Sequence, residues 1–194
     1  RLFSQVGLAT QAMLWHVGVQ TVLPPGYLCC GYPQRGSGQF DRADKIITDN
    51  RVLFHRVANT LNYLDIRTVI VSCGTCMDQL QKYEFEKIFP GCRLLDIHEY
   101  LLEKGVKLRG IEGTRYMYHD PCHLGRKQGV TAAPRDLLRS IPGVQYVELP
   151  EASWCCGGAG SYNLTNPGMS SAVLARKMGH VESTGADTLV TSCP

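Results

Sequence analysis

The chain has 194 residues, of which 44% are hydrophobic and 19% charged, and its formal net charge is +3. This length and composition fit a globular protein made of one domain or two small fused ones, and they exclude a disordered chain. Lysine and arginine are spread along the sequence and not clustered, which argues against a nucleic-acid-binding or membrane-surface patch.

The hydrophobic pattern predicts helices alternating with strands along the whole chain. The apolar stretch 6–23 is interrupted by Gln11, His16 and Gln20, so it predicts an amphipathic helix leading into a strand, and not a transmembrane segment. The predicted elements that follow, in chain order, are strand 19–23, helix 40–64, strand 68–72, helix 77–89, strand 93–97, helix 98–104, strand 115–119, helix 134–140, strand 145–149, helix 167–183 and strand 188–192. Such alternation predicts an α/β fold with a parallel sheet covered on both faces.

Two sequence elements occur twice, in the same order and at nearly the same spacing. One is a proline followed by Cys-Cys-Gly, at 24–31 and again at 150–157; the other is Thr-x-x-x-Ser-Cys, at 68–73 and again at 188–193. A repeat of this kind predicts two copies of one Rossmann-like unit. The expected units, divided in a charged, glycine-containing segment, are residues 1–108 and 109–194.

Nine cysteines are the outlying feature of the composition. Eight of them follow predicted strands, and the carboxyl ends of parallel strands are where such sheets bind ligands, with helix amino-termini that favour an anion. These eight candidate metal ligands are Cys29, Cys30, Cys73, Cys76, Cys122, Cys155, Cys156 and Cys193. The ninth, Cys92, has no counterpart in the other unit and is predicted to be a buried structural residue. An odd cysteine count among long helices and β-branched strands argues for a cytoplasmic, metal-binding protein over a disulfide-stapled secreted one.

The cysteine motifs differ in how specific they are. The C-x-x-C at Cys73 and Cys76 suits zinc, iron–sulfur and thiol redox chemistry alike. Adjacent cysteines on a regular strand would point to opposite faces, whereas a loop relieved by glycine can direct both sulfurs to one centre. Gly157, Gly158 and Gly160 are therefore expected to let backbone amides approach the sulfurs of a cluster, and Gly31, Gly157 and Gly158 are the candidate cofactor-binding glycines. Sequence alone does not separate zinc from an iron–sulfur cluster.

Two histidines flank Cys122 and are the remaining candidates for cofactor contact. His119 and His123 could ligate a metal or donate a hydrogen bond to a thiolate. The alternative, slightly favoured, is that they cap the following helix. Asp120 is likewise predicted to be a turn and cap residue and not a catalytic acid.

The Cys-Cys-Gly pairs, His119-Asp-Pro-Cys-His123 and Trp154-Cys-Cys-Gly-Gly-Ala-Gly160 resemble the cysteine-rich "CCG" domain family over nearly the whole chain. That family includes the B subunit of heterodisulfide reductase and the iron–sulfur subunits of glycolate oxidase and lactate-utilisation systems, and similar stretches end fused FAD-linked D-lactate dehydrogenases. The family pattern is a lone Cys, a Cys-Cys pair and a C-x-x-C in each unit. By that pattern the first unit lacks its upstream Cys and the second its last Cys. The resemblance implies [4Fe–4S] clusters, up to one in each unit, in a segment of a longer protein.

The chain carries no dinucleotide, P-loop or metalloprotease motif, so FAD is expected on a partner or on another domain. The leading hypothesis is an iron–sulfur module that passes electrons from a flavin-dependent lactate or glycolate dehydrogenase to quinone or another carrier. A disulfide reductase subunit and a zinc-stabilised structural module are the alternatives. Expected partners are a flavoprotein and a further iron–sulfur domain, in the cytoplasm or peripherally on the cytoplasmic face of the inner membrane.

Overall fold

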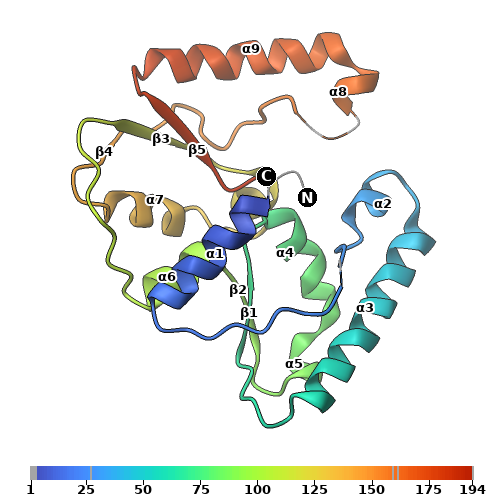
Figure 1. Ribbon diagram of the computed structural model, residues 1–194. Helices are drawn as coiled ribbons and strands as arrows, with labels where there is room; N and C mark the ends of the chain where they lie inside the picture. Colours follow the sequence, from blue (N-terminus) through green and yellow to red (C-terminus); the bar gives the residue numbers. More distant parts are fainter. Residues whose placement is uncertain (1–3, 27, 159, 161, 194) are drawn as a thin grey trace. The chain divides into compact units, whose positions relative to one another are not determined.

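The computed structural model describes residues 4–26, 28–158, 160 and 162–193 (Figure 1). The chain divides into two compact units, Arg1–Lys104 (unit 1) and Gly105–Pro194 (unit 2), and each contains a small parallel sheet with helices around it. The predicted α/β class is therefore confirmed. No helix in the described part of the chain combines the length and apolarity that crossing a membrane requires.

Unit 1 is built on a two-stranded parallel sheet. Its elements, in chain order, are α1 (Ser4–His16), α2 (Tyr32–Gly36), α3 (Phe40–Thr60), β1 (Thr68–Val71), α4 (Gly74–Leu80), the 3-10 helix η1 (Gln81–Tyr83), α5 (Phe85–Ile88), β2 (Arg93–Asp96) and α6 (Ile97–Glu103). The two strands are in register from Thr68 opposite Arg93 to Val71 opposite Asp96. Asp96 and Glu99 form a capping box that starts α6 directly at the end of β2.

The core of unit 1 is aromatic and lies between α3 and the segment that follows α4. Phe54 of α3 makes edge contacts with Tyr83 and Phe85, at 6.2 and 5.1 Å between ring centroids. Ile47 of α3 and Cys92 belong to the same buried cluster. Cys92 is thus a core residue, as the sequence predicted, and burial raises the pKa of its thiol.

Two predictions for unit 1 are wrong. Residues 19–23 form no strand. Among the described residues β1 pairs with β2 alone, and residues 19–23 and β1 both line one cavity. The β-branched residues of this segment therefore have no neighbouring strand to pair with. The helix predicted at 77–89 is broken into α4, η1 and α5, because Glu84 adopts a left-handed backbone with φ of +51°. That break directs the side chains of Tyr83 and Phe85 into the buried core cluster.

Unit 2 is built on a three-stranded parallel sheet in the order β4-β3-β5. Its elements are β3 (Arg115–His119), the π-helix η2 (Cys122–Lys127), α7 (Ala132–Arg139), β4 (Gln145–Tyr146), α8 (Tyr162–Thr165), α9 (Pro167–Ser183) and β5 (Thr188–Thr191). Figure 1 shows α9 and α7 on opposite sides of this sheet. The core under α9 contains Met117, Leu149 and Ala152, which pack against Val181 and Ala186.

The predictions for unit 2 are closer to the structure. The bounds of β3 and α9 agree with the predicted ones, and β5 ends one residue early. The ladder of β4 stops at Tyr146, after which Val147 adds one further amide bond to the carbonyl oxygen of Tyr116, at 2.8 Å. Helix α7 begins before Pro134, which sits in its first turn, where a missing amide proton costs no hydrogen bond. The π-helix η2 and the short helix α8 were not predicted.

Candidate metal centres

All nine cysteines are free thiols. Among the residues that the structure describes, no group of three or more Cys, His, Asp and Glu side chains is already arranged to hold a metal ion. The thiols described below are therefore sets of neighbours and not preformed coordination spheres.

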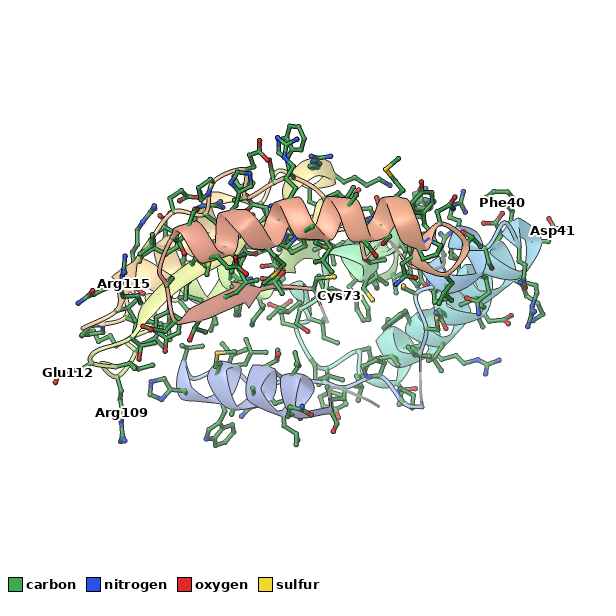
Figure 2. The ribbon with its side chains drawn as sticks, turned by 90° about the horizontal axis from the view of Figure 1, so that it is seen from above. Phe40, Asp41, Cys73, Arg109, Glu112 and Arg115 are labelled. Atoms are coloured by element: carbon green, nitrogen blue, oxygen red, sulfur yellow. The ribbon has the colours of Figure 1, made fainter. Side chains whose placement is uncertain are left out.

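In unit 1 Cys76 contacts both its near neighbour Cys73 and Cys30, which is distant in the sequence. Cys73, labelled in Figure 2, is the N-cap residue of α4 and comes two residues after the end of β1, and Cys76 lies one turn further on. A hydrogen bond with Cys76 lowers the pKa of Cys73 to about 6, and backbone amides of Thr75 and Cys76 contribute in the same direction. The contact with Cys76 also lowers the pKa of Cys30 to about 7, while the pKa of Cys76 itself is raised. The contacts therefore favour the thiolate, the form that binds metal, at Cys30 and Cys73, and the protonated thiol at Cys76.

The Cys29-Cys30 turn is attached to α3 and to the aromatic core. The buried Asn50 of α3 donates one hydrogen bond to the carbonyl oxygen of Cys29, at 2.7 Å, and another to the hydroxyl of Tyr83, at 2.8 Å. Gly31 has φ of +88°, and its amide donates to the sulfur of Cys29 at 3.5 Å. Gly31 therefore turns the chain so that an amide faces a sulfur, and its contact with a cofactor stays a prediction.

A cavity of about 870 Å³ opens onto the cysteines of unit 1. Its walls are the segment 19–24, the segment 66–71 and apolar side chains of α1, α3 and α5. Its lining includes all four predicted ligands of this unit: Cys29, Cys30, Cys73 and Cys76. A volume of this size is within the range of small-molecule sites.

In unit 2 the predicted ligands follow the three strands of one sheet. His119 at the end of β3 is in register with Thr191 of β5, so the segments that carry Cys122 and Cys193 leave the same edge. The hydroxyls of Tyr118 and Ser192 bond to each other at 2.9 Å across these strands. Residues after β4 reach the same edge, because the amide of Asp120 donates to the carbonyl oxygen of Ala152 at 3.1 Å.

The thiol of Cys122 lies within electrostatic reach of Cys155 and Cys156. Partial desolvation raises the pKa of Cys122, the negative charge of Cys155 and Cys156 raises it further, and Arg126 opposes both effects. The amide of Gly157 donates to the sulfur of Cys155 at 3.3 Å, as the amide of Gly31 does to the sulfur of Cys29 in unit 1. Gly158, also predicted to approach sulfur, lies where a Cβ atom would be 3.6 Å from the sulfur of Cys156.

The Cys155-Cys156 loop is fastened to α9 on both sides. Upstream, Glu151 has a left-handed backbone with φ of +52°. Its carboxylate accepts a hydrogen bond from Nε of Arg176 at 3.0 Å and lies 3.1 Å from Nε2 of His180, and these contacts hold that backbone conformation. Downstream, the hydroxyl of Ser170 donates to the carbonyl oxygen of Gly157. Gly157 has φ of +81°, and a Cβ atom there would overlap the carbonyl oxygen of Ser170. Only glycine fits this position without moving α9.

The segment before Cys122 is held by a buried ion pair. Asp120, 4% exposed, accepts two hydrogen bonds from Arg135 of α7, at 2.6 and 2.8 Å. The predicted capping role is not seen, because no side chain caps η2. His119 is buried, and burial followed by the charge of Lys177 lowers the pKa of its imidazole, which favours the neutral ring; its contact with a cofactor stays a prediction. The role of His123 stays a prediction.

Two residues of this site were missed at the sequence level. Arg135 and Lys177 look like ordinary charges on exposed helix faces, yet Lys177 is only 4% exposed. The sequence of α9 gives no amphipathic signal for this, because Ser170 and Lys177 are buried while Leu174 and Met178 are exposed; Lys177 lies about two helical turns from Ser170, on the same inward face.

Comparison with known proteins gives one family. The Cysteine-rich domain (CCG) family matches residues 1–81 and 116–194. Lactate utilization protein A of Oceanobacillus iheyensis is 31% identical over 204 residues, which cover 97% of this chain and 79% of that protein. The probable glycolate oxidase iron-sulfur subunit of Bacillus subtilis is 30% identical over 206 residues, covering all of this chain and 45% of that protein.

A methanogen protein is also similar. The B subunit of the fumarate reductase (CoM/CoB) of Methanothermobacter marburgensis is 31% identical over 191 residues, which cover 97% of this chain but 37% of that protein. Two iron-sulfur proteins of other methanogens are covered to 36% and 34% of their lengths. The chain thus spans little more than a third of these three relatives.

Proposed function

This chain belongs to the Cysteine-rich domain (CCG) family, and we propose that it is an iron–sulfur electron-transfer module of an oxidoreductase. The observation that carries the proposal is the pair of Cys-Cys-Gly turns, each with a backbone amide on a sulfur and with further thiols beside it. Names of its relatives, a lactate utilization protein and a glycolate oxidase iron-sulfur subunit, point to the same class.

The residues of each unit suit an iron–sulfur cluster. The ligands would be Cys29, Cys30, Cys73 and Cys76 in unit 1 and Cys122, Cys155, Cys156 and Cys193 in unit 2. Thiolate ligands, amide groups directed at sulfur and low pKa values of Cys30 and Cys73 are the features that such clusters require. A bound cluster would supply one-electron chemistry, and the chain's own residues hold the turns that carry the thiols. The [4Fe–4S] type, and one cluster in each unit, are part of this proposal.

We also propose that the two units are copies of one Rossmann-like unit, divided near the boundary predicted from the sequence. Each has a strand followed by a cysteine, and each has a Cys-Cys-Gly turn resting on the next long helix. The family matches the chain in two separate stretches, which supports the same division.

The electron donor in this proposal is a flavoprotein that oxidises a 2-hydroxy acid such as lactate or glycolate. FAD would lie on that partner or on another part of the same polypeptide, and a further iron–sulfur domain or quinone would accept the electrons. The names of the relatives support a partner oxidoreductase subunit. A cytoplasmic location, with or without peripheral attachment to the inner membrane, belongs to the proposal as well.

The test is analysis of iron and acid-labile sulfide in anaerobically purified full-length protein, together with its visible spectrum. We expect a coloured protein that contains iron and sulfide and bleaches on one-electron reduction. Colourless, iron-free protein would refute the proposal. Zinc without sulfide would favour a structural module instead.

A second function, disulfide reduction, is favoured by one observation, the cavity of about 870 Å³ that reaches all four cysteines of unit 1. A metal centre there would be open to a small disulfide. The check is to add substrate disulfides to the reduced, iron-loaded protein. A change in the spectrum that depends on the disulfide supports this function, and a constant spectrum rules it out.

A further inference from the structure

The two Cys-Cys-Gly turns rest on their helices in the same way. Gly31 lies against Ala43, the fourth residue of α3, and Gly157 lies against Ser170, the fourth residue of α9. Both glycines have positive φ, +88° and +81°. Residues at equal distances along α3 and α9 therefore face the same part of each turn.

Seven residues beyond these contacts, the two units differ in charge. In α3 the residue is Asn50, 8% exposed, which donates to the carbonyl oxygen of Cys29 at 2.7 Å. In α9 it is Lys177, 4% exposed, whose Nζ donates to the carbonyl oxygen of Glu151 at 2.5 Å. Both side chains hold the backbone that leads to a cysteine pair, but only Lys177 brings a positive charge.

The hydrogen bond of Lys177 goes to the backbone oxygen of Glu151. Two carboxylates, those of Glu151 and Asp120, also act on its charge, and Asp120 is already paired with Arg135. The carboxylate of Glu151 is already shared by Arg176 and His180. A buried ammonium that is bonded to a carbonyl leaves a net positive potential around it.

That potential reaches the thiols of unit 2. Lys177 holds the backbone oxygen of Glu151, four residues before Cys155, and it belongs to the helix against which Gly157 packs, so its charge lies beside the cysteine loop. Burial lowers the pKa of Lys177, while Glu151, Cys156, Asp120 and Cys155 raise it. In unit 1 the strongest influences on Cys30 and Cys73 are a neighbouring thiol, burial and backbone amides, and not a cation.

We propose that the metal centre of unit 2 has the higher reduction potential of the two. The difference arises because unit 2 has Lys177 where unit 1 has Asn50. Buried positive charge stabilises the more negative, reduced form of an iron–sulfur cluster. At equilibrium an electron delivered by the flavoprotein then resides mostly on the unit 2 centre. A reduced unit 1 centre gives one electron to an oxidised unit 2 centre, so the first is oxidised and the second is reduced by one electron. This inference rests on the proposed function, because it requires a metal centre in each unit.

The experiment is a redox titration of the iron-loaded full-length protein followed by electron paramagnetic resonance. Cys30→Ser and Cys156→Ser variants assign the signals to unit 1 and unit 2. The variants to compare are Lys177→Met, which removes the charge at similar length, Lys177→Asn, which installs the unit 1 residue, and Lys177→Arg, which keeps the charge.

In the wild-type protein we expect the unit 2 centre to be reduced first. Lys177→Met and Lys177→Asn should disfavour its reduction at least about tenfold at equilibrium, or about 59 mV for one electron, and leave unit 1 unchanged. Lys177→Arg should stay close to wild type. Two centres that titrate in the opposite order, or variants that shift neither centre or both equally, would overturn the inference while the proposed function stands.

The order of reduction in wild-type protein tests the inference even where a variant fails to fold. Wild-type protein without iron would overturn the proposed function, and this inference with it.

Discussion

Replacing Gly157 by alanine places a methyl group between the Cys155-Cys156 loop and α9. The residue has φ of +81°, which costs an L-residue about 1–2 kcal/mol. The new Cβ atom would also overlap the carbonyl oxygen of Ser170 and lie 3.3 Å from the amide nitrogen of Leu174. Both neighbours are helix backbone and cannot rotate away, so overpacking adds about 1–3 kcal/mol. The expected loss in the free energy of unfolding of unit 2 is about 2–5 kcal/mol.

The matched control is Gly129→Ala in the same unit. Gly129 has φ of +71° and nothing within 4 Å of its Cβ position, so only the backbone strain, about 1–2 kcal/mol, should remain. Urea unfolding can follow unit 2 alone, because the chain has two tryptophans and a Trp15→Phe background leaves Trp154 as the reporter. Equal destabilisation by the two glycine variants would refute the close contact between the loop and α9.

Three further outcomes follow from the contacts described above. Arg135→Met should destabilise unit 2 by about 3–5 kcal/mol in urea unfolding, because it leaves the buried carboxylate of Asp120 unpaired, and a loss below about 1 kcal/mol would contradict the buried pair. In metal-free protein, alkylation at Cys73 should reach half its maximal rate near pH 6, since the thiolate forms as pH rises through that pKa; a midpoint near pH 9 would show that Cys76 does not stabilise it. Asn50→Leu should cost about 1–3 kcal/mol in unit 1, because the carbonyl oxygen of Cys29 loses its partner, and unchanged stability would exclude that bond.

Much of the fold follows from local pattern. The β-branched runs at β1 and β5 and the long run of α9 that begins at Pro167 are strong signals, and the strands and helix lie close to where the sequence placed them. Residues 19–23 have the same strand-like composition, but a strand also needs a bonded neighbour, and β1 does not provide one. The break at Glu84 was equally hidden, because a left-handed residue other than glycine has no sequence signal of its own.

Some residues of the candidate site could likewise be predicted from the sequence, and others could not. The cysteines, Gly31 and Gly157 could be singled out because their spacing and repetition are visible in the sequence, and the structure directs amides at the sulfurs as expected. Asp120 was taken for a cap, whereas its role depends on Arg135, which comes from a different helix. Lys177 could not be identified either, because its burial arises from the packing of α9 over the loop, and charge alone does not reveal that.

The central claim is that two separate sets of thiols each hold one metal centre. Iron and sulfide counted per chain in anaerobically purified full-length protein tests it most directly, for wild type and the variants Cys30→Ser, Cys156→Ser and Cys92→Ser. We predict that Cys30→Ser and Cys156→Ser each remove one centre and leave the other, and that Cys92→Ser, a core substitution, removes none. Loss of all iron from either single variant would mean one shared centre, and iron lost through Cys92→Ser would show that the assigned ligands are wrong.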